Sequence, residues 1–169
     1  DYTPYHINQV LALKLVNRDA IAQADLKIVV DAVNSVGGVV IPALLRALGV
    51  KEIIELNCEP TGHFAHNPEP IPENLTQIAA KMKESRADLG IVVDPDVDRL
   101  ALISENGEMF GEEYTLVAVA DYVLKHTPGN TVSNLSSSRA LKDVTEAYGQ
   151  QYHAAAVGEV NVVAEMKRT

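Results

Sequence analysis

Three aspartates at alternate positions, Asp94, Asp96 and Asp98, could together bind a metal ion. They directly follow the apolar stretch 89–93, which reads as a buried strand, and open α/β sheets bind ligands at the carboxyl ends of their strands. At roughly 4–5 Å and an effective dielectric near 20, each pair of carboxylates repels by about 3–4 kcal/mol. A hard divalent cation removes that repulsion, and Mg²⁺ prefers a few carboxylates together with water or a phosphate. The sequence therefore predicts a Mg²⁺ site with these three ligands.

A phosphate ligand would also explain the basic residue that ends this loop. Arg99 can hold a phosphate through two parallel hydrogen bonds. The chain has a formal net charge of -9 and no cluster of basic residues, so it should repel nucleic acid and anionic membrane surfaces. A bound cation would let such an acidic protein hold an anionic substrate.

Other interpretations of the acidic loop are possible. An exposed turn fits poorly because apolar strands are expected on both sides. An EF-hand starting at Asp94 would place Glu105 at position 12, but it needs Gly where Arg99 stands, and helices instead of strands beside the loop. Two alternatives stay open: a phosphatase of the haloacid-dehalogenase type acting through Asp94, and a divalent-metal or sugar-phosphate binding module without chemistry.

The composition is that of a globular protein with an aliphatic core. Of 169 residues 47% are hydrophobic, few are aromatic, and no apolar run reaches membrane-spanning length. The single cysteine, Cys58, cannot form an internal disulfide, so a reducing compartment and a cytoplasmic location are expected. We interpret Cys58 as a packing residue.

Strands and helices are expected to alternate along the chain, which indicates parallel pairing with helices covering the sheet. Strands are predicted at 27–33, 52–56, 89–93, 100–104, 131–135 and 151–156, and helices at 7–16, 37–48, 73–85, 112–126, 138–148 and 160–167. The predicted fold class is α/β: a three-layer α/β/α domain with a mixed, largely parallel sheet at 1–107, followed by a truncated second α/β domain at 108–169.

The acidic loop and its flanks resemble the α-D-phosphohexomutases, which include phosphoglucomutase, phosphomannomutase and phosphoglucosamine mutase. The residues Asp94-x-Asp96-x-Asp98-Arg99 are similar to the family's Asp-Gly-Asp-Gly-Asp-Arg metal loop, with Pro95 and Val97 at the glycine positions. The similarity continues in order through 27–38, 64–70, 72–75, 107–124, 138–141 and 157–158. The chain thus resembles domain 2 and part of domain 3 of this family.

The resemblance implies an isomerase that moves a phosphoryl group between C1 and C6 of a hexose or hexosamine phosphate. A phosphoserine in domain 1 would donate the phosphate, with Mg²⁺ bridging it to the three aspartates and Arg99 anchoring it. The family's catalytic serine loop, Ser-His-Asn-Pro in domain 1, is absent. Residues 65–68 are similar to that loop but have Ala65 at the position of the serine. Domains 1 and 4 are missing, so the fragment has no catalytic residue of its own and is expected to be inactive.

Two later segments are candidates for the substrate cleft. Ser136 ends a predicted strand, and Gly158 and Glu159 follow the next one; a helix N-cap at Ser138 and a tight turn at Gly158 are the simpler structural interpretations. Some hexomutases carry Lys and His near the positions of Ser136 and Glu159, so the hexose is left open, with phosphoglucosamine mutase preferred among the subfamilies.

Overall fold

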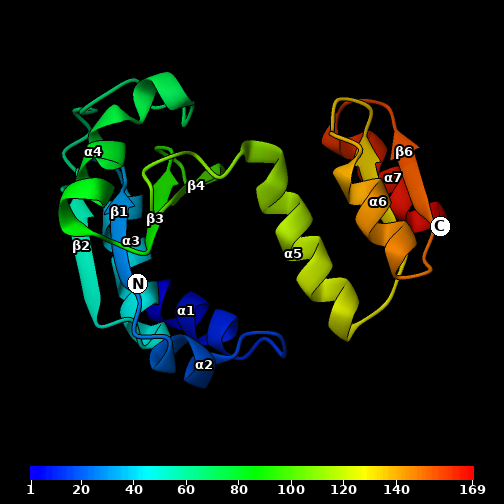
Figure 1. The fold of residues 1–169 in the computed structure, drawn as a ribbon, viewed down its shortest axis with the longest axis horizontal. Coiled ribbons are helices and arrows are strands. Elements are labelled where there is room, and N and C mark those ends of the chain that lie inside the picture. The colour runs from blue at the N-terminus through cyan, green and yellow to red at the C-terminus, as the bar shows by residue number, and fades with distance from the viewer. The chain divides into compact units, whose positions relative to one another are not determined.

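The protein is described by a computed structural model of residues 1–169, from which only the side chain of Glu112 is left out. The chain forms two compact units, Asp1–Phe110 and Gly111–Thr169 (Figure 1). No described helix is both long and apolar enough to cross a membrane.

The first unit is built on a four-stranded sheet with strand order β2-β1-β3-β4. The central strand β1 pairs in parallel with both β2 and β3, whereas β4 runs antiparallel to β3. The strands are β1 (Lys27–Asp31), β2 (Glu52–Leu56), β3 (Leu89–Val93) and β4 (Leu100–Ser104). The helices are α1 (Thr3–Leu11), α2 (Arg18–Gln23), α3 (Gly37–Leu48) and α4 (Thr76–Ser85), with a 3₁₀ turn η1 (Pro72–Asn74). The predicted α/β class with a mixed, largely parallel sheet is confirmed.

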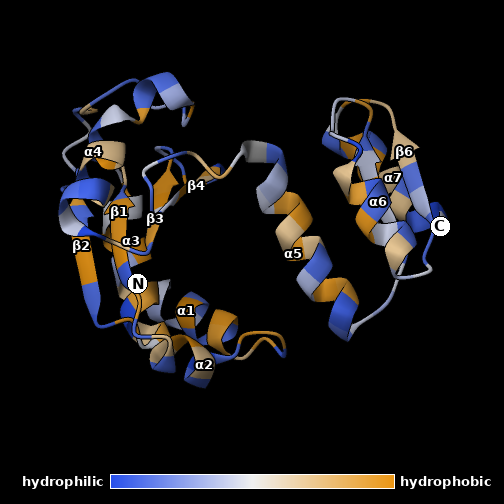
Figure 2. Ribbon diagram, in the orientation of Figure 1, coloured by the Kyte–Doolittle hydropathy of each residue, from blue (hydrophilic) through white to orange (hydrophobic). Residues whose placement is uncertain are grey.

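Two apolar cores lie on the two faces of this sheet, because successive strand side chains point in opposite directions. Val29 packs with Ile78 and Met82 of α4, whereas Val30 packs with Leu45 of α3. All five side chains are at most 7% exposed. The middle of β1 is correspondingly hydrophobic (Figure 2). Burying one such side chain stabilises the fold by about 1.5–3 kcal/mol.

A close backbone approach fixes the first turn of α3. A Cβ built on Gly38 would lie 2.1 Å from the carbonyl oxygen of Cys58, so only glycine fits there. The helix ends at residue 48, as predicted, where Gly49 adopts the left-handed conformation. Helix α3 is thereby held against the segment that leaves β2.

The second unit contains two parallel strands, β5 (Thr131–Asn134) and β6 (Tyr152–Ala155). Its helices are α5 (Glu112–His126), α6 (Ala140–Ala147) and α7 (Glu159–Arg168). It continues the α/β pattern with a small sheet, as expected for the second domain.

The helices of the first unit differ from the predictions in three places. The helix expected at 73–85 is divided, because Pro72 starts a 3₁₀ turn and Leu75 leaves helical geometry before α4 begins. The first helix, predicted at 7–16, spans Thr3–Leu11, with Pro4 in its first turn, where proline is tolerated. The short α2 was missed because six residues show too little periodicity.

Candidate functional site

The acidic loop, residues 94–99, lies at the carboxyl end of β3. One carboxylate oxygen each from Asp94, Asp96 and Asp98 can be chosen so that all three lie within 4.8 Å of one another. Asp94 is 7% exposed, whereas Asp96 and Asp98 are exposed. The predicted metal ligands therefore converge, with one anchored in the protein and two facing solvent.

Hydrogen bonds within the loop, and one from the turn after β1, keep the backbone of the acidic loop in place. The backbone N–H of Arg99 donates to Asp94 Oδ1 at 3.1 Å, and the N–H of Val97 donates to the carbonyl of Asp94 at 3.2 Å. Ser35, which follows β1, donates its hydroxyl to the carbonyl of Pro95 at 2.8 Å. The loop is thus closed on Asp94 and tied to the neighbouring strand.

Val97 adopts a left-handed backbone conformation with φ 63°. This region disfavours branched side chains, at a cost of about 1–3 kcal/mol. A glycine would adopt it freely, and the resembling loops have glycine there. The loop therefore keeps the turn geometry although valine replaces the glycine.

The three carboxylates repel one another. The pKa of the Asp98 carboxyl is raised above its ordinary value, first by the charge of Asp96 and then by a side-chain hydrogen bond with Asp94 and that residue's charge. Arg99 acts in the opposite direction and lowers it. This donor set suits a hard divalent cation, because clustered oxygen anions are what such an ion requires.

Arg99 lies beside a cavity of about 350 Å³ that the acidic loop shares with the proline-rich segment, residues 57–75. Its guanidinium Nη1 is 3.2 Å from Glu69 Oε1, and both side chains are more than half exposed. The cavity is lined by Asn67, Pro68, Glu69, Asp94, Pro95 and Arg99. The cavity lining therefore combines carboxylates with a guanidinium that can bind an anion.

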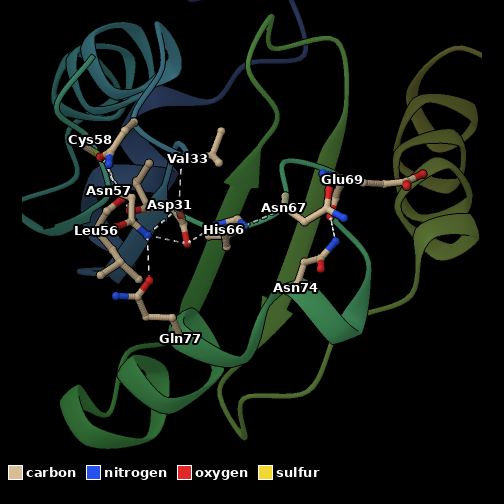
Figure 3. A network of polar contacts seen from close by, with 12 residues as sticks. Asp31, Val33, Leu56, Asn57, Cys58, His66, Asn67, Glu69, Asn74 and Gln77 are labelled. Atoms are coloured by element: carbon tan, nitrogen blue, oxygen red, sulfur yellow. Dashed lines mark hydrogen bonds and ion pairs between the residues drawn. The ribbon is translucent and has the colours of Figure 1, made fainter. Parts of the chain in front are cut away.

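A buried carboxylate at the end of β1 holds the proline-rich segment (Figure 3). Asp31 is 0% exposed and accepts hydrogen bonds from the N–H of Val33 at 3.1 Å and from Asn57 Nδ2 at 3.2 Å. His66 Nε2 lies 3.2 Å from Asp31 Oδ2, and His66 Nδ1 lies 2.8 Å from the carbonyl of Asn67. Asp31 is paired with Val92 of β3, two residues before Asp94. Its oxygens are engaged by protein partners, so it is not among the converging ligands.

The substrate-cleft candidates lie in the second unit. Because β5 and β6 are parallel neighbours, Ser136 and the pair Gly158 and Glu159 leave the sheet at the same edge. Ser136 donates through its N–H and hydroxyl to Asn134 Oδ1 at 3.0 and 2.6 Å. Gly158 has φ 119°, which favours glycine, and precedes α7, where Glu159 is the first residue.

A carboxylate occupies the start of α6. Glu113 Oε2 accepts a hydrogen bond from the N–H of Ser138 at 2.9 Å. Ser138 was predicted as the N-cap; its hydroxyl does accept from the N–H of Ala140 at 3.3 Å, but the helix begins at Ala140, with Arg139 at the N-cap position. An anion would have to displace Glu113 to reach the N–H of Ser138.

Sequence reasoning missed the partners that support the site. Asp31 could have been found as a charged residue at the end of an apolar strand. His66 and Glu69 were not among the predicted site residues. The sequence offers no pattern that links these residues, because their contacts span intervals of about 30 residues or more.

Two family models match nearly the whole chain. Residues 4–107 match phosphoglucomutase/phosphomannomutase, alpha/beta/alpha domain II, and residues 111–169 match alpha/beta/alpha domain III. The chain belongs to the phosphoglucomutase/phosphomannomutase family, as its resemblance predicts. This membership implies a metal cofactor in general, and it does not favour the phosphatase or the non-catalytic module.

Curated relatives agree with this assignment. A probable phosphoglucosamine mutase of Methanopyrus kandleri is 34% identical over 96% of this chain and 35% of its own length. A phosphomannomutase/phosphoglucomutase of Pseudomonas aeruginosa is 34% identical over 100% of this chain and 36% of its own length. The chain thus spans about a third of the length of these relatives.

Solved structures share the fold. A phosphoglucomutase/phosphomannomutase family protein of Burkholderia thailandensis superposes with a TM-score of 0.77 at 32% identity, over 94% of this chain and 36% of that one. A putative phosphomannomutase of Thermus thermophilus superposes with a TM-score of 0.88 over 99% of this chain and 39% of that one. Its identity of 23% makes it a likeness of fold alone.

Proposed function

We propose that the acidic loop is the Mg²⁺ site of a phosphohexomutase, with Asp94, Asp96 and Asp98 as ligands and Arg99 as a phosphate-binding residue. The observation that carries this proposal is the convergence of three carboxylates within 4.8 Å at the end of β3, in a chain of this family. The raised pKa of Asp98 supports it, because a cation would relieve the repulsion behind that shift.

The whole protein would transfer a phosphoryl group between C1 and C6 of a hexose or hexosamine phosphate through a phosphoserine. That serine, and domains 1 and 4, would belong to parts of the protein outside this chain, which spans about a third of its relatives. The isolated 169-residue chain is therefore expected not to turn over substrate. We place the enzyme among the isomerases and in the cytoplasm, where its single cysteine would stay reduced.

We assign residues 1–107 to domain 2 and 108–169 to part of domain 3. The compact units and the two family matches support a division in this region. Ser136, Gly158 and Glu159 are proposed to contact the substrate, because parallel pairing of β5 and β6 brings their loops to one edge.

The residues of this chain would bind and orient the reacting group. Bound Mg²⁺ would supply positive charge that neutralises the transferring phosphoryl group. Arg99 would donate hydrogen bonds to a phosphate in the cavity of the acidic loop. The backbone hydrogen bond from Arg99 to Asp94 would keep that guanidinium near the ligands.

The test is a mutase assay of the longer protein that carries this chain, with hexose 1-phosphates and hexosamine 1-phosphates as substrates. We expect Mg²⁺-dependent formation of the 6-phosphates, and a fall in kcat of at least about 100-fold for Asp98→Asn. Activity that survives both chelation and Asp98→Asn would refute the proposal. Release of inorganic phosphate instead of an isomer would favour the phosphatase.

A further inference from the structure

The proline-rich segment forms one wall of the cavity beside the acidic loop, yet it has no regular structure before η1. Its beginning is tied to the turn after β1, because Asn34 contacts the backbone of Gly62 and His63. Its end is fixed by α4. Residues 64–69, which carry the cavity-lining side chains, need an anchor of their own.

His66 supplies a hydrogen bond from this stretch to the sheet. Its side chain is 14% exposed, and the side chain of its partner Asp31 is also buried. The contact joins residues that are 35 positions apart, from the proline-rich segment to the end of β1. A buried carboxylate needs hydrogen-bonding partners, so this contact serves Asp31 as well.

The surroundings of the imidazole ring define how it is oriented. The carbonyl of Asn67 can only accept, so His66 Nδ1 must carry a proton to make the 2.8 Å contact. Nε2 is then the nitrogen that faces Asp31. Asp31 Oδ2 is also an acceptor, so the ring that makes both hydrogen bonds carries a proton on each nitrogen and donates once to its own segment and once to the sheet.

From His66 the fixed geometry continues to Arg99. The carbonyl of Glu69 accepts from Asn74 Nδ2 at 2.8 Å and from the N–H of Ile71 at 2.9 Å, which holds the backbone at Glu69 from the downstream side. The carboxylate of Glu69 then meets the guanidinium of Arg99. Figure 3 shows this succession from Asp31 through His66 and Asn67 to Glu69.

We propose that His66, through its hydrogen bond to the buried Asp31, is a positioning residue that holds the proline-rich segment beside the acidic loop. It thereby keeps Glu69 against Arg99 and shapes the wall of the anion-binding cavity. The consequence for phosphate binding rests on the proposed function; the positioning of the segment does not.

Two substitutions distinguish the contact of His66 with Asp31 from its contact with the carbonyl of the neighbouring Asn67. In His66→Asn the amide can replace Nδ1 and keep the bond to the carbonyl of Asn67, but it cannot reach Asp31. In His66→Gln the amide can replace Nε2 and keep the bond to Asp31. The matched control is His63→Asn, since the contacts of His63 with Asn34 and Thr61 are made by its backbone.

Hydrogen exchange of the Ile71 and Asn74 amides, measured on the 169-residue chain, reports how firmly the segment is held. Titration with inorganic phosphate in the presence of Mg²⁺ then measures the phosphate affinity of the cavity. Titration with Mg²⁺ alone measures the metal affinity of the three aspartates. We expect His66→Asn to speed exchange at both amides by about tenfold and to weaken phosphate binding by about fivefold, with Mg²⁺ affinity within about twofold of wild type. His66→Gln and His63→Asn should resemble the wild type.

Wild-type exchange in His66→Asn, or equal disturbance in His66→Gln and His66→Asn, would overturn the positioning role. Should His66→Asn not fold, exchange in His66→Gln decides alone: near-wild-type protection supports the role, and loss of protection overturns it. If the wild-type chain binds no Mg²⁺ while the contrast between the two variants holds, the proposed function fails and the positioning role stands.

Discussion

The carboxyl ends of β1 and β3 lie side by side, and both carry aspartates with opposite properties. Asp31 on β1 is buried and surrounded by donors from the protein itself. On β3, Asp94 leads into a loop whose other two carboxylates are exposed and mainly repel one another. The aspartate at the end of β1 thus has its hydrogen-bonding partners within the protein, whereas the aspartates after β3 form a cluster with excess negative charge.

This difference separates a structural role from a binding role. A carboxylate whose hydrogen bonds are complete has no capacity left for a ligand, and its removal leaves unpaired donors in the interior. Neutralising one member of a cluster with excess charge relieves repulsion in the folded chain, but it weakens the cluster's attraction for a cation. The following predictions test this contrast, beginning with the largest effect.

Replacing Asp31 with alanine should be strongly destabilising. The substitution leaves the N–H of Val33 and the side chains of Asn57 and His66 without their buried acceptor. We expect the free energy of unfolding in urea to fall by about 3 kcal/mol. A loss below about 1 kcal/mol would show that water or a neighbour replaces the carboxylate at little cost.

Burial, together with the charges of two nearby carboxylates, should suppress the reactivity of Cys58. The pKa of this half-buried thiol is raised from 9.0 to about 11, first by burial and then by the charges of Glu55 and Asp31. At pH 8 the reactive thiolate should therefore be roughly 100-fold scarcer than in an exposed cysteine. Alkylation by iodoacetamide should be slow in the folded chain and should become fast in urea, and equal rates in both would contradict this account.

Neutralising a member of the acidic loop should change the pH dependence of stability. The folded-state pKa of Asp98 is raised mainly by Asp96, so the folded chain binds this proton more tightly than the unfolded chain does. Without metal, this group's contribution makes the free energy of unfolding decrease as the pH rises from 3.8 through the raised pKa. In Asp98→Asn that contribution is absent, so the slope of the free energy of unfolding against pH, measured in urea from about pH 3 to about pH 7 in a metal-free buffer, should be less negative or more positive than in the wild type. An identical slope would argue against repulsion in the loop.

The smallest effect on stability is expected at the exposed ion pair beside the loop. Glu69 and Arg99 are both more than half exposed, and such pairs contribute about 0–1 kcal/mol. Glu69→Gln should therefore leave the melting temperature almost unchanged. A large loss of stability would mean that this pair holds the segment directly, without the anchor at His66.

The sequence was sufficient for what depends on local pattern. The strand at 89–93 and the helix at 37–48 were predicted with the bounds that the structure has, because a local pattern of apolar residues marks each of them. The ligands Asp94, Asp96 and Asp98 were identified because they lie together in one loop. Residues whose contacts cross between elements were not predicted, since no local signal connects Asp31 with His66 or Glu69 with Arg99.

Glycine positions show the same limit. The helix starting at residue 37 was predicted, but the close approach of Gly38 to Cys58, which explains why glycine is required there, was not. Val97 shows the reverse. Its backbone has a left-handed conformation that favours glycine, yet the sequence has valine there. Both depend on tertiary geometry that composition and periodicity do not contain.

The central claim, that Asp94, Asp96 and Asp98 bind a divalent cation, is tested most directly by calorimetric titration of the 169-residue chain with Mg²⁺. The matched control is Asp25→Asn, which removes an exposed carboxylate paired with Lys51. We predict saturable binding of one ion per chain, weakened by at least about tenfold in Asp98→Asn and unchanged in Asp25→Asn. No saturable binding by the wild type, or equal affinity in Asp98→Asn, would contradict the assignment.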